Sequence, residues 1–181
     1  MLSGAALALI GDVFGPLDGF SALHRIRRRV VLWGANASPI TMEHAAVVLS
    51  ERALLDAVDP HLSPAPKKAK QTSTWSILTS PPLPAGTKEH HFGHRRATAV
   101  SVTLRDRVDS SACWVESVRD GWLFLIPTGP NSAYLLAVGD RPEPLLDTSR
   151  LIAQRIEQLC EPAGEFPAHP RLRWPLCGRA G

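Results

Sequence analysis

Cysteine is scarce in this chain of 181 residues, and the three that occur, Cys113, Cys160 and Cys177, stand far apart. The sequence holds no Cys-x-x-Cys motif, and an odd number of widely spaced cysteines does not make the disulfide framework of a small secreted domain. No window is long and apolar enough to be a transmembrane helix. These absences predict reduced thiols, a cytoplasmic location and no association with a membrane.

The signature motifs of several enzyme classes are also missing. The chain has no Walker-type phosphate loop, no Gly-x-Gly-x-x-Gly turn for a dinucleotide and no Gly-x-Ser-x-Gly elbow for a hydrolase serine. His90, His91 and His94 form the most metal-like cluster, but the second pair of ligands that a structural zinc site needs is absent. We predict a polar strand there and no metal. Cys113 lies amid strand-like residues, which favours a small core residue over a catalytic nucleophile.

The composition is that of a folded globular protein, with 44% hydrophobic residues, 20% charged residues and a net charge of +3. This length allows one ordinary domain with a sizeable core. Basic residues are densest in two runs, 24–29 and 66–70. Such runs either contact phosphates and nucleic acid or form a solvated helix end and a basic loop, and the absence of interleaved aromatic residues favours the second reading. We therefore predict no nucleic-acid partner.

The first residues, MLSGAALALIGDVFG, contain a short apolar run that no basic residue precedes and that Asp12 follows closely. A secretory signal peptide has a basic start and a longer apolar run, so we predict a buried helix over 2–14 instead. Gly15 and Pro16 end this helix, because glycine favours a helix terminus and proline cannot continue one. A connector or short helix is expected from there to Arg29.

Two short strands and a helix are predicted next. The β-branched run at 30–33 favours a strand, and a second strand is plausible at 45–49. Ser50 is a good N-cap for a helix over 51–58, because its hydroxyl can accept a hydrogen bond from an unpaired backbone amide. The residues expected on the buried side of that helix are Leu54, Leu55 and Val58.

The second half of the chain has the clearest strand signals. Alternation over 97–104 places Val100, Val102 and Leu104 on one face. Asp120 with Gly121 is a typical turn between two strand-like runs. The elements predicted here are strands at 97–104, 113–118, 121–126 and 132–139, an amphipathic helix at 145–159, and a Pro-rich tail at 161–181 without a final element.

The chain is therefore predicted to have an α+β fold, with a mostly antiparallel sheet packed by helices. We divide it into a helix–strand–helix segment (1–58), a linker or mobile loop (59–73), a sheet with a closing helix (74–160) and a tail (161–181). The run WLFLI at 122–126 is apolar throughout, which is typical of a strand covered on both faces. One face is expected to meet a helix, and the other a ligand cavity or a second domain.

Aromatic residues around the predicted hairpin suggest a binding surface. Trp114 and Trp122 flank its turn, Glu116 shares the face of Trp114, and Phe124 shares the face of Trp122. These four residues are candidates for an apolar pocket that holds one carboxylate, and core packing explains them equally well.

The segments ACWVESVRDGWLFLIPTG and AYLLAVGDRPEPLLDTSRLIAQRIEQL resemble the substrate domain of FAD-dependent oxidoreductases. The most similar types are tryptophan halogenases and flavin monooxygenases of the para-hydroxybenzoate hydroxylase group. HRIRRRVVLWGANASPITMEHAAVVLSERALLDAV looks like an earlier stretch of the same family, and the resemblance spans most of residues 5–178. It implies a sheet that lies over the flavin ring and binds a small apolar or aromatic substrate.

This resemblance also implies FAD as the cofactor, although a complete Rossmann-type nucleotide domain is missing. Where many relatives carry an arginine near the adenosine side, Glu51 and Arg52 stand here as the cofactor-binding candidates. We expect a partial or shortened FAD-dependent monooxygenase or halogenase-like enzyme that supplies the substrate sheet and is inactive alone. The alternative is a non-enzymatic ligand-binding or interaction domain that lacks the cofactor half.

Overall fold

The computed structural model describes residues 1–15, 20, 23–61, 88–91, 96–139, 141–167 and 171–174. The chain divides into two compact units, which consist of Met1–Leu62 with Arg95–Ala168, and of Ser63–His94 with His169–Gly181. The described part of the second unit is an antiparallel pair of short strands, β4 (Lys88–His91) and β10 (Arg171–Trp174). Both candidate sites considered below lie in the first unit.

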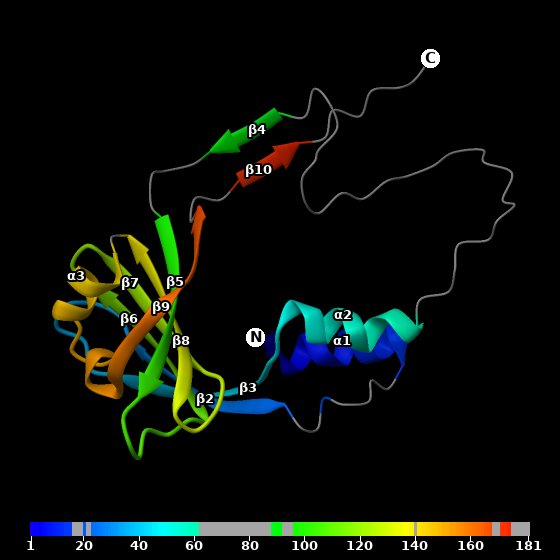
Figure 1. Cartoon of the computed structure of the whole chain (residues 1–181), viewed down its shortest axis with the longest axis horizontal. Coiled ribbons are helices and arrows are strands. Elements are labelled where there is room, and N and C mark those ends of the chain that lie inside the picture. Colours follow the sequence, from blue (N-terminus) through cyan, green and yellow to red (C-terminus); the bar gives the residue numbers. More distant parts are fainter. Residues whose placement is uncertain are drawn as a thin grey trace, which may run out of the picture. The chain divides into compact units, whose positions relative to one another are not determined.

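The first unit is built on one eight-stranded sheet with the strand order β1-β3-β2-β6-β7-β8-β5-β9 (Figure 1). All neighbouring strands are antiparallel except β2 and β6, which run parallel. This mostly antiparallel sheet with accompanying helices confirms the predicted α+β class. The strands are β1 (Leu2–Ser3), β2 (His24–Leu32), β3 (Ile40–Val48), β5 (Arg96–Leu104), β6 (Ala112–Val118), β7 (Gly121–Pro127), β8 (Ser132–Gly139) and β9 (Ile156–Pro167).

Hydroxyl caps begin the first two helices. Ser3 accepts a hydrogen bond from the amide of Ala6, and Ser50 accepts one from the amide of Ala53 at 3.0 Å, which confirms the predicted cap at Ser50. None of the helices that the structure describes is long and apolar enough to cross a membrane. The described helical segments are α1 (Gly4–Phe14), α2 (Glu51–Val58), α3 (Pro142–Asp147) and the 3₁₀ turns Asp59–His61 and Ala153–Arg155.

The β6–β7 hairpin lies close to its predicted bounds, and two glycines allow a close approach at its turn. A Cβ atom at Gly121 would lie 2.1 Å from the carbonyl oxygen of Val138 on β8. Gly139 has φ of 130°, and a Cβ atom there would lie 2.3 Å from the carbonyl oxygen of Asp120. Neither position has room for a side chain, so the hairpin turn is packed directly on the end of β8.

One face of the sheet, which we call the core face, holds the main hydrophobic cluster. The end of α3 and the chain after it close this face through Leu145, Leu151 and Ile152, all of which are buried. The predicted alternation in β5 is confirmed, because its three apolar residues point into this cluster. The buried strand residues of this cluster are Leu32, Val100, Val102, Leu104, Ala112, Trp114, Leu123, Leu125, Ala133, Leu135, Ala137 and Ile156.

The predicted helix over 145–159 is wrong. Helix α3 ends at Asp147, a turn and a 3₁₀ segment follow, and β9 begins at Ile156 as an edge strand paired with β5. The backbone amides of 150–152 donate to the Glu116 carboxylate instead of to carbonyls of a continuing helix. A local pattern of apolar spacing could not reveal this competing partner, which is distant in sequence.

The basic run at 24–29 is part of β2 and is therefore neither a connector nor a helix end. Strand β2 begins at His24, well before the predicted start at residue 30, because its first residues pair with β3, and pairing with β6 is added from Arg28 onward. Strand β3 begins at Ile40 rather than at residue 45. Pairing with β3 and β6 thus extends β2 through basic residues whose side chains favour solvent.

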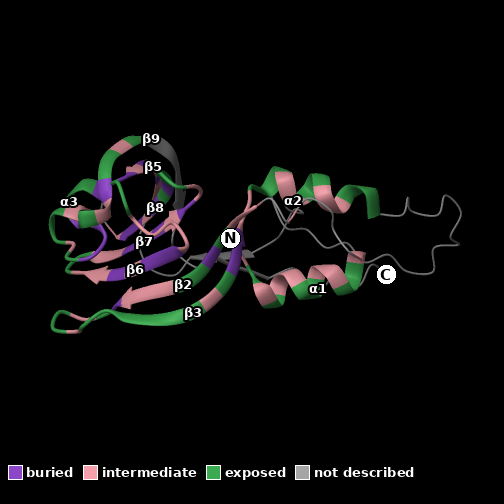
Figure 2. Ribbon diagram, turned by 90° about the horizontal axis from the view of Figure 1, so that it is seen from below, coloured by how far each residue is buried: buried purple, intermediate pink, exposed green. Residues whose placement is uncertain are grey.

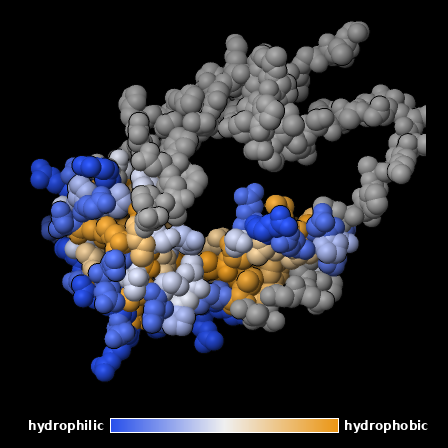
Figure 3. Space-filling model, viewed as in Figure 1, coloured by the Kyte–Doolittle hydropathy of each residue, from blue (hydrophilic) through white to orange (hydrophobic). Residues whose placement is uncertain are grey.

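Helix α1 forms where it was predicted, but it is not buried. Neither α1 nor α2 contains a buried residue, and Figure 2 draws both without the colour for burial. Leu9 and Val13 of α1 are 63% and 65% exposed, and Leu55 of α2 is 57% exposed, so the predicted buried side of α2 is wrong for Leu55. Apolar surface over these helices is visible in Figure 3.

The units differ from the divisions drawn from the sequence. Segment 1–58 and the strands after residue 96 belong to one sheet, because β2 pairs with β6. The tail was expected to lack a final element, and this is wrong because β9 continues to Pro167 and β10 follows. Most of the linker predicted at 59–73 lies outside the described residues, apart from the 3₁₀ turn at its start.

Candidate functional site

The β6–β7 hairpin divides the four candidate substrate residues between two faces. Trp114 pairs with Leu125, and Glu116 pairs with Leu123, on the core face. Directly opposed residues of an antiparallel pair share a face and successive residues alternate, so Phe124 lies on the other side of the sheet. Trp122, two residues before Phe124, lies there too. The structure therefore does not bring the four side chains into one pocket.

Trp114 belongs to the closed core. Its side chain is 3% exposed and packs within the main hydrophobic cluster. The Arg155 guanidinium lies 5.1 Å from the centre of its ring, in a cation–π contact, and also donates to the carbonyl of Leu151. Burial lowers the pKa of Arg155, and the nearby Glu116 carboxylate partly offsets that change. Trp114 thus stabilises the chain that covers the core and does not belong to the face of Trp122 and Phe124.

Glu116 is 1% exposed and is the buried charged residue of the described chain. Its two carboxylate oxygens accept hydrogen bonds from Ser149 Oγ at 2.5 Å, from the Arg150 amide at 2.6 Å and from the Ile152 amide at 2.9 Å. The Leu151 amide donates to both oxygens at 3.1 Å. These bonds occupy the carboxylate, so Glu116 orders the turn after α3 rather than holding a substrate.

The opposite side of the sheet, which we call the open face, is only partly covered. Trp122, Phe124 and Ile126 on β7 are half-buried, and Tyr134 on β8 is 46% exposed. No described helix contributes a buried residue to this face, since α3 belongs to the core cluster and neither α1 nor α2 contains a buried residue. Cys113 and Val138 on the same face are buried. A continuous half-buried row crosses five strands in the order Val31, Val115, Phe124, Leu136 and Ala99.

Beside this row, β2 and β3 place a guanidinium next to an imidazole. Arg29 Nη2 donates to His44 Nε2 at 2.9 Å. Because arginine only donates, His44 Nε2 must be unprotonated, and the neutral ring carries its proton on Nδ1. Burial and the positive charge of Arg29 both lower the pKa of His44. Arg29 Nε is buried and makes no hydrogen bond within the described chain.

Cys113 lies opposite Arg29 in the parallel pairing of β2 and β6. Its thiol is fully buried in a small cluster with Ile26 and Ala46, against which Phe124 packs. Burial raises the pKa of the Cys113 thiol, and Arg29 opposes this only in part. A buried, protonated thiol is a poor nucleophile, so Cys113 is the core residue that the sequence favoured.

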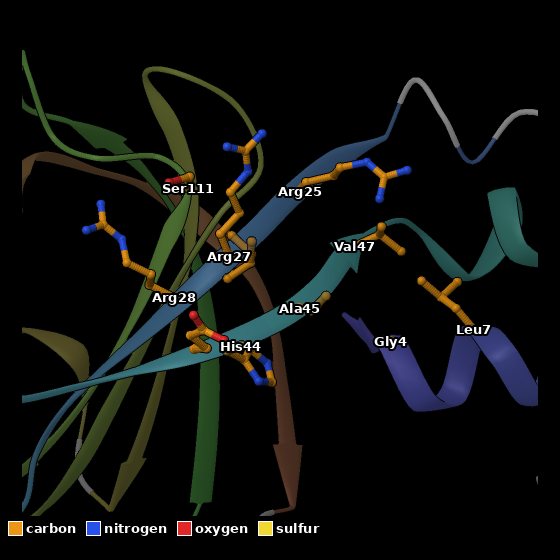
Figure 4. A pocket seen from close by; sticks show the side chains of 12 residues that line it. Gly4, Leu7, Arg25, Arg27, Arg28, His44, Ala45, Val47 and Ser111 are labelled. Carbon is orange, nitrogen blue, oxygen red and sulfur yellow. The ribbon is translucent and has the colours of Figure 1, made fainter.

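Figure 4 shows how the remaining side chains of the basic run lie. Arg25, Arg27 and Arg28 project from β2 on one side of the β2–β3 pair, and His44 projects from β3 on the other. A bulge between Ile26 and Arg28 brings three arginines to the same side. They line a cavity of about 810 Å³ between the strand pair and α1. The sequence revealed the run of positive charge but not the direction in which each side chain points.

The two cofactor-binding candidates lie at the exposed start of α2. Arg52 Nε pairs with Asp56 Oδ1 at 2.9 Å, and its side chain is 84% exposed. A pyrophosphate at this helix start would meet the Glu51 carboxylate, while the charge of Arg52 is already shared with Asp56. These residues do not fit an FAD pyrophosphate.

The histidine cluster predicted from the sequence lies partly outside the described residues. His90 and His91 lie on β4, and His94 lies outside the described residues. Among the residues that the structure describes, no group of three or more His, Cys, Asp or Glu side chains could hold a metal ion.

No protein-family model matches the sequence, and no curated protein matches it at a significant level. The resemblance to flavin-dependent enzymes therefore stays a prediction.

Proposed function

We propose that the open face of the sheet binds a small aromatic or apolar molecule. The observation that carries this proposal is the inequality of the two faces. The core face is closed by α3 and the turn that Glu116 orders, whereas the opposite face presents half-buried aromatic side chains that no described helix covers. Flat aromatic side chains provide large contact areas with little loss of conformational freedom on binding.

Phe124 is the centre of the proposed binding surface. It lies in the middle of the row that crosses the sheet, and its ring packs against the cluster that holds Cys113. A side chain anchored in this way is already ordered before a ligand arrives, which lowers the entropic cost of binding. Trp122 lies two residues away on the same strand face and extends the surface toward the hairpin turn.

In FAD-dependent monooxygenases and halogenases, which the sequence resembles, the substrate sheet likewise binds a small aromatic or apolar molecule. We propose that the chain contributes such a substrate-binding sheet, and that the residues described here do not hold the flavin. The expected result is weak or no FAD binding and no turnover by the purified chain. Titration with FAD, followed by flavin fluorescence, checks this, and a tight stoichiometric complex would contradict it.

The alternative function is that of a non-enzymatic binding or interaction domain with the same ligand face. It is favoured by the misfit between FAD and the start of α2, where Glu51 repels phosphate and Arg52 is paired with Asp56. Under this alternative the chain binds an apolar ligand stably without any flavin. Ligand titrations with and without an added flavin-loaded nucleotide-binding domain separate the two functions, because only the first predicts that such a domain changes the ligand's affinity.

The face itself is tested by titrating the chain with indole and following the binding by calorimetry. Replacing Phe124 or Trp122 with leucine removes the ring but keeps apolar volume, and we expect each change to weaken binding about fivefold or more. Trp33→Leu is the matched control, because Trp33 is 60% exposed and lies beyond the end of β2. Equal affinities in all three variants would rule out the open face as the binding surface.

A further inference from the structure

A second cavity, distinct from the open face, lies at one end of the core face. It has a volume of about 430 Å³ and is bounded by β2, β3, β6, the loop after β5 and the 3₁₀ turn before β9. Four arginines line it: Arg28, Arg105, Arg107 and Arg155. They face two aspartates, so the lining carries a formal excess of two positive charges.

One of the two negative charges of the cavity, that of Asp109, is engaged. One oxygen of Asp109 accepts hydrogen bonds from the amide and hydroxyl of Ser111 at 3.0 and 2.7 Å, and the other pairs with Arg28. Burial raises the pKa of Asp109, but the hydrogen bonds from Ser111 and the ion pair with Arg28 outweigh this and lower it. Asp109 therefore fixes Arg28 in place and has little charge left for the other arginines.

The positive charges are less fully neutralised. The side chains of Arg105 and Arg107 make no hydrogen bond or ion pair with any described residue. Arg155 is held over the Trp114 ring, and the carboxylate of Glu116 behind it is occupied by the turn amides. Four arginines thus line the cavity with two aspartates, and the exposed Asp106 is the carboxylate that remains for Arg105 and Arg107.

Arg107 occupies an unusual backbone position. Its φ is 65°, the only positive φ among the described residues other than glycine, within a turn closed by the Val108 amide and the Arg105 carbonyl. Glycine would adopt this conformation without strain, whereas an arginine here costs about 1 kcal/mol. Arg107 and Arg105, two positions before it, are both exposed residues of the cavity lining.

We propose that this cavity binds the phosphate group of a small phosphorylated molecule. Guanidinium groups match phosphate oxygens with paired hydrogen bonds, and a phosphate monoester carries up to two negative charges at neutral pH, which complements the excess in the lining. The cavity falls in the size range of small-ligand sites and leaves room for an organic group beyond the phosphate. This site is independent of the proposed aromatic face.

The test uses the full chain, inorganic phosphate and pyrophosphate as probes, and calorimetry at constant ionic strength. Arg107→Gly removes the positive charge of the side chain and relieves the backbone strain, so the fold is retained. The affinity for phosphate is expected to fall about tenfold, which is the effect of losing one charge-assisted hydrogen bond. Arg105→Gln should weaken binding similarly. Arg119→Gln is the matched control, since Arg119 is exposed in the β6–β7 turn, away from the cavity, and its loss changes the net charge equally.

Binding that is saturable, weakened in the two cavity variants and unchanged in the control supports the proposal. Equal binding of phosphate by all variants would overturn the proposal. Equal heat changes on titration with chloride would also overturn it, because general screening of charge would then explain the signal. A single-stranded oligonucleotide provides the third arm. If it binds far more tightly than pyrophosphate and Arg25→Gln weakens it as much as Arg107→Gly does, the arginines form an extended polyanion surface and the small-ligand proposal is wrong.

Discussion

At the scale of single residues, Glu116 is the most informative side chain in the molecule. It lies on a strand that the sequence identifies, yet its partners are backbone amides more than thirty positions later. Replacing a buried carboxylate that accepts several hydrogen bonds strongly destabilises the folded state. The N–H and O–H groups that donated to it lose their partner where water cannot replace it. Glu116 therefore contributes to stability in this chain rather than to recognition.

Glu116→Gln is expected to lower the free energy of unfolding by about 3 kcal/mol, since the amide nitrogen cannot accept hydrogen bonds from the turn. Urea denaturation measures this change. Glu143→Gln, at an exposed position of α3, is the control and should shift stability by less than about 0.5 kcal/mol. If the two variants were equally stable, the hydrogen bonds to Glu116 would not be contributing as described.

His44 predicts a dependence of stability on pH. Its pKa is lowered in the folded chain by burial and by Arg29, so the unfolded chain takes up a proton first, near the ordinary value of about 6.5. Stability from this group is present above that pH and is lost as the pH falls below it. His44→Gln keeps an acceptor for Arg29 without titrating, so the variant should lose less stability than the native chain between about pH 7.5 and about pH 5.

Urea midpoints at the two pH values, compared between the native chain and the variant, give the measurement. All titratable groups other than His44 are common to the two proteins, so the comparison isolates the contribution of His44. An identical loss in the two proteins would show that His44 accepts its proton without penalty in the folded chain.

At the scale of secondary-structure elements, the β6–β7 hairpin and β8 are joined by backbone contacts that only glycine permits. Gly121→Ala would place a methyl group 2.1 Å from the carbonyl oxygen of Val138, and a backbone atom cannot move away as a flexible side chain can. We expect a loss of about 2 kcal/mol or more in the free energy of unfolding.

Gly11→Ala is the contrasting variant at this scale. A Cβ atom at Gly11 in α1 meets nothing within 4 Å, so alanine should raise stability by up to about 1 kcal/mol through its higher helix propensity. Thermal melts of both variants provide the comparison. A destabilised Gly11→Ala or a neutral Gly121→Ala would contradict the packing described here.

At the scale of the whole molecule, the parallel pairing of β2 with β6 joins the two halves of the first unit. Ile26 and Ala46 from the N-terminal strands cover Cys113 of β6. The later strands therefore do not make a complete sheet without the earlier ones. The proposed ligand face depends on the same pairing, because its row of residues begins at Val31.

A chain of residues 96–167 alone should lack a cooperative thermal transition and should self-associate, because the edge of β6 and the cluster around Cys113 would be exposed. Circular dichroism and size-exclusion chromatography test this. Adding a peptide of residues 24–48 should restore the transition if the lost pairing is the cause. A monomeric fragment with a sharp transition by itself would show that β2 and β3 are dispensable.

Local chemistry determined much of this fold in advance. Period-two alternation, the Asp120–Gly121 turn and the Ser50 cap act between near neighbours, so the central strands, the hairpin and α2 were predicted close to their observed bounds. The same local patterns placed Trp114 with Glu116 on one face of the hairpin. They could not say whether that face would be open to a ligand or closed.

Tertiary structure decided what depends on distant partners. Glu116 drew the amides of 150–152 away from a helix, and β3 together with β6 extended β2 through a basic run. Helix α3 closed the face of Trp114 and not that of Phe124. The convergence of Arg28, Arg105, Arg107 and Arg155 on one cavity likewise joins three separate stretches of chain. These contacts arise only when the sheet assembles, because burial and long-range hydrogen bonding outweigh the weaker preferences that a local sequence encodes.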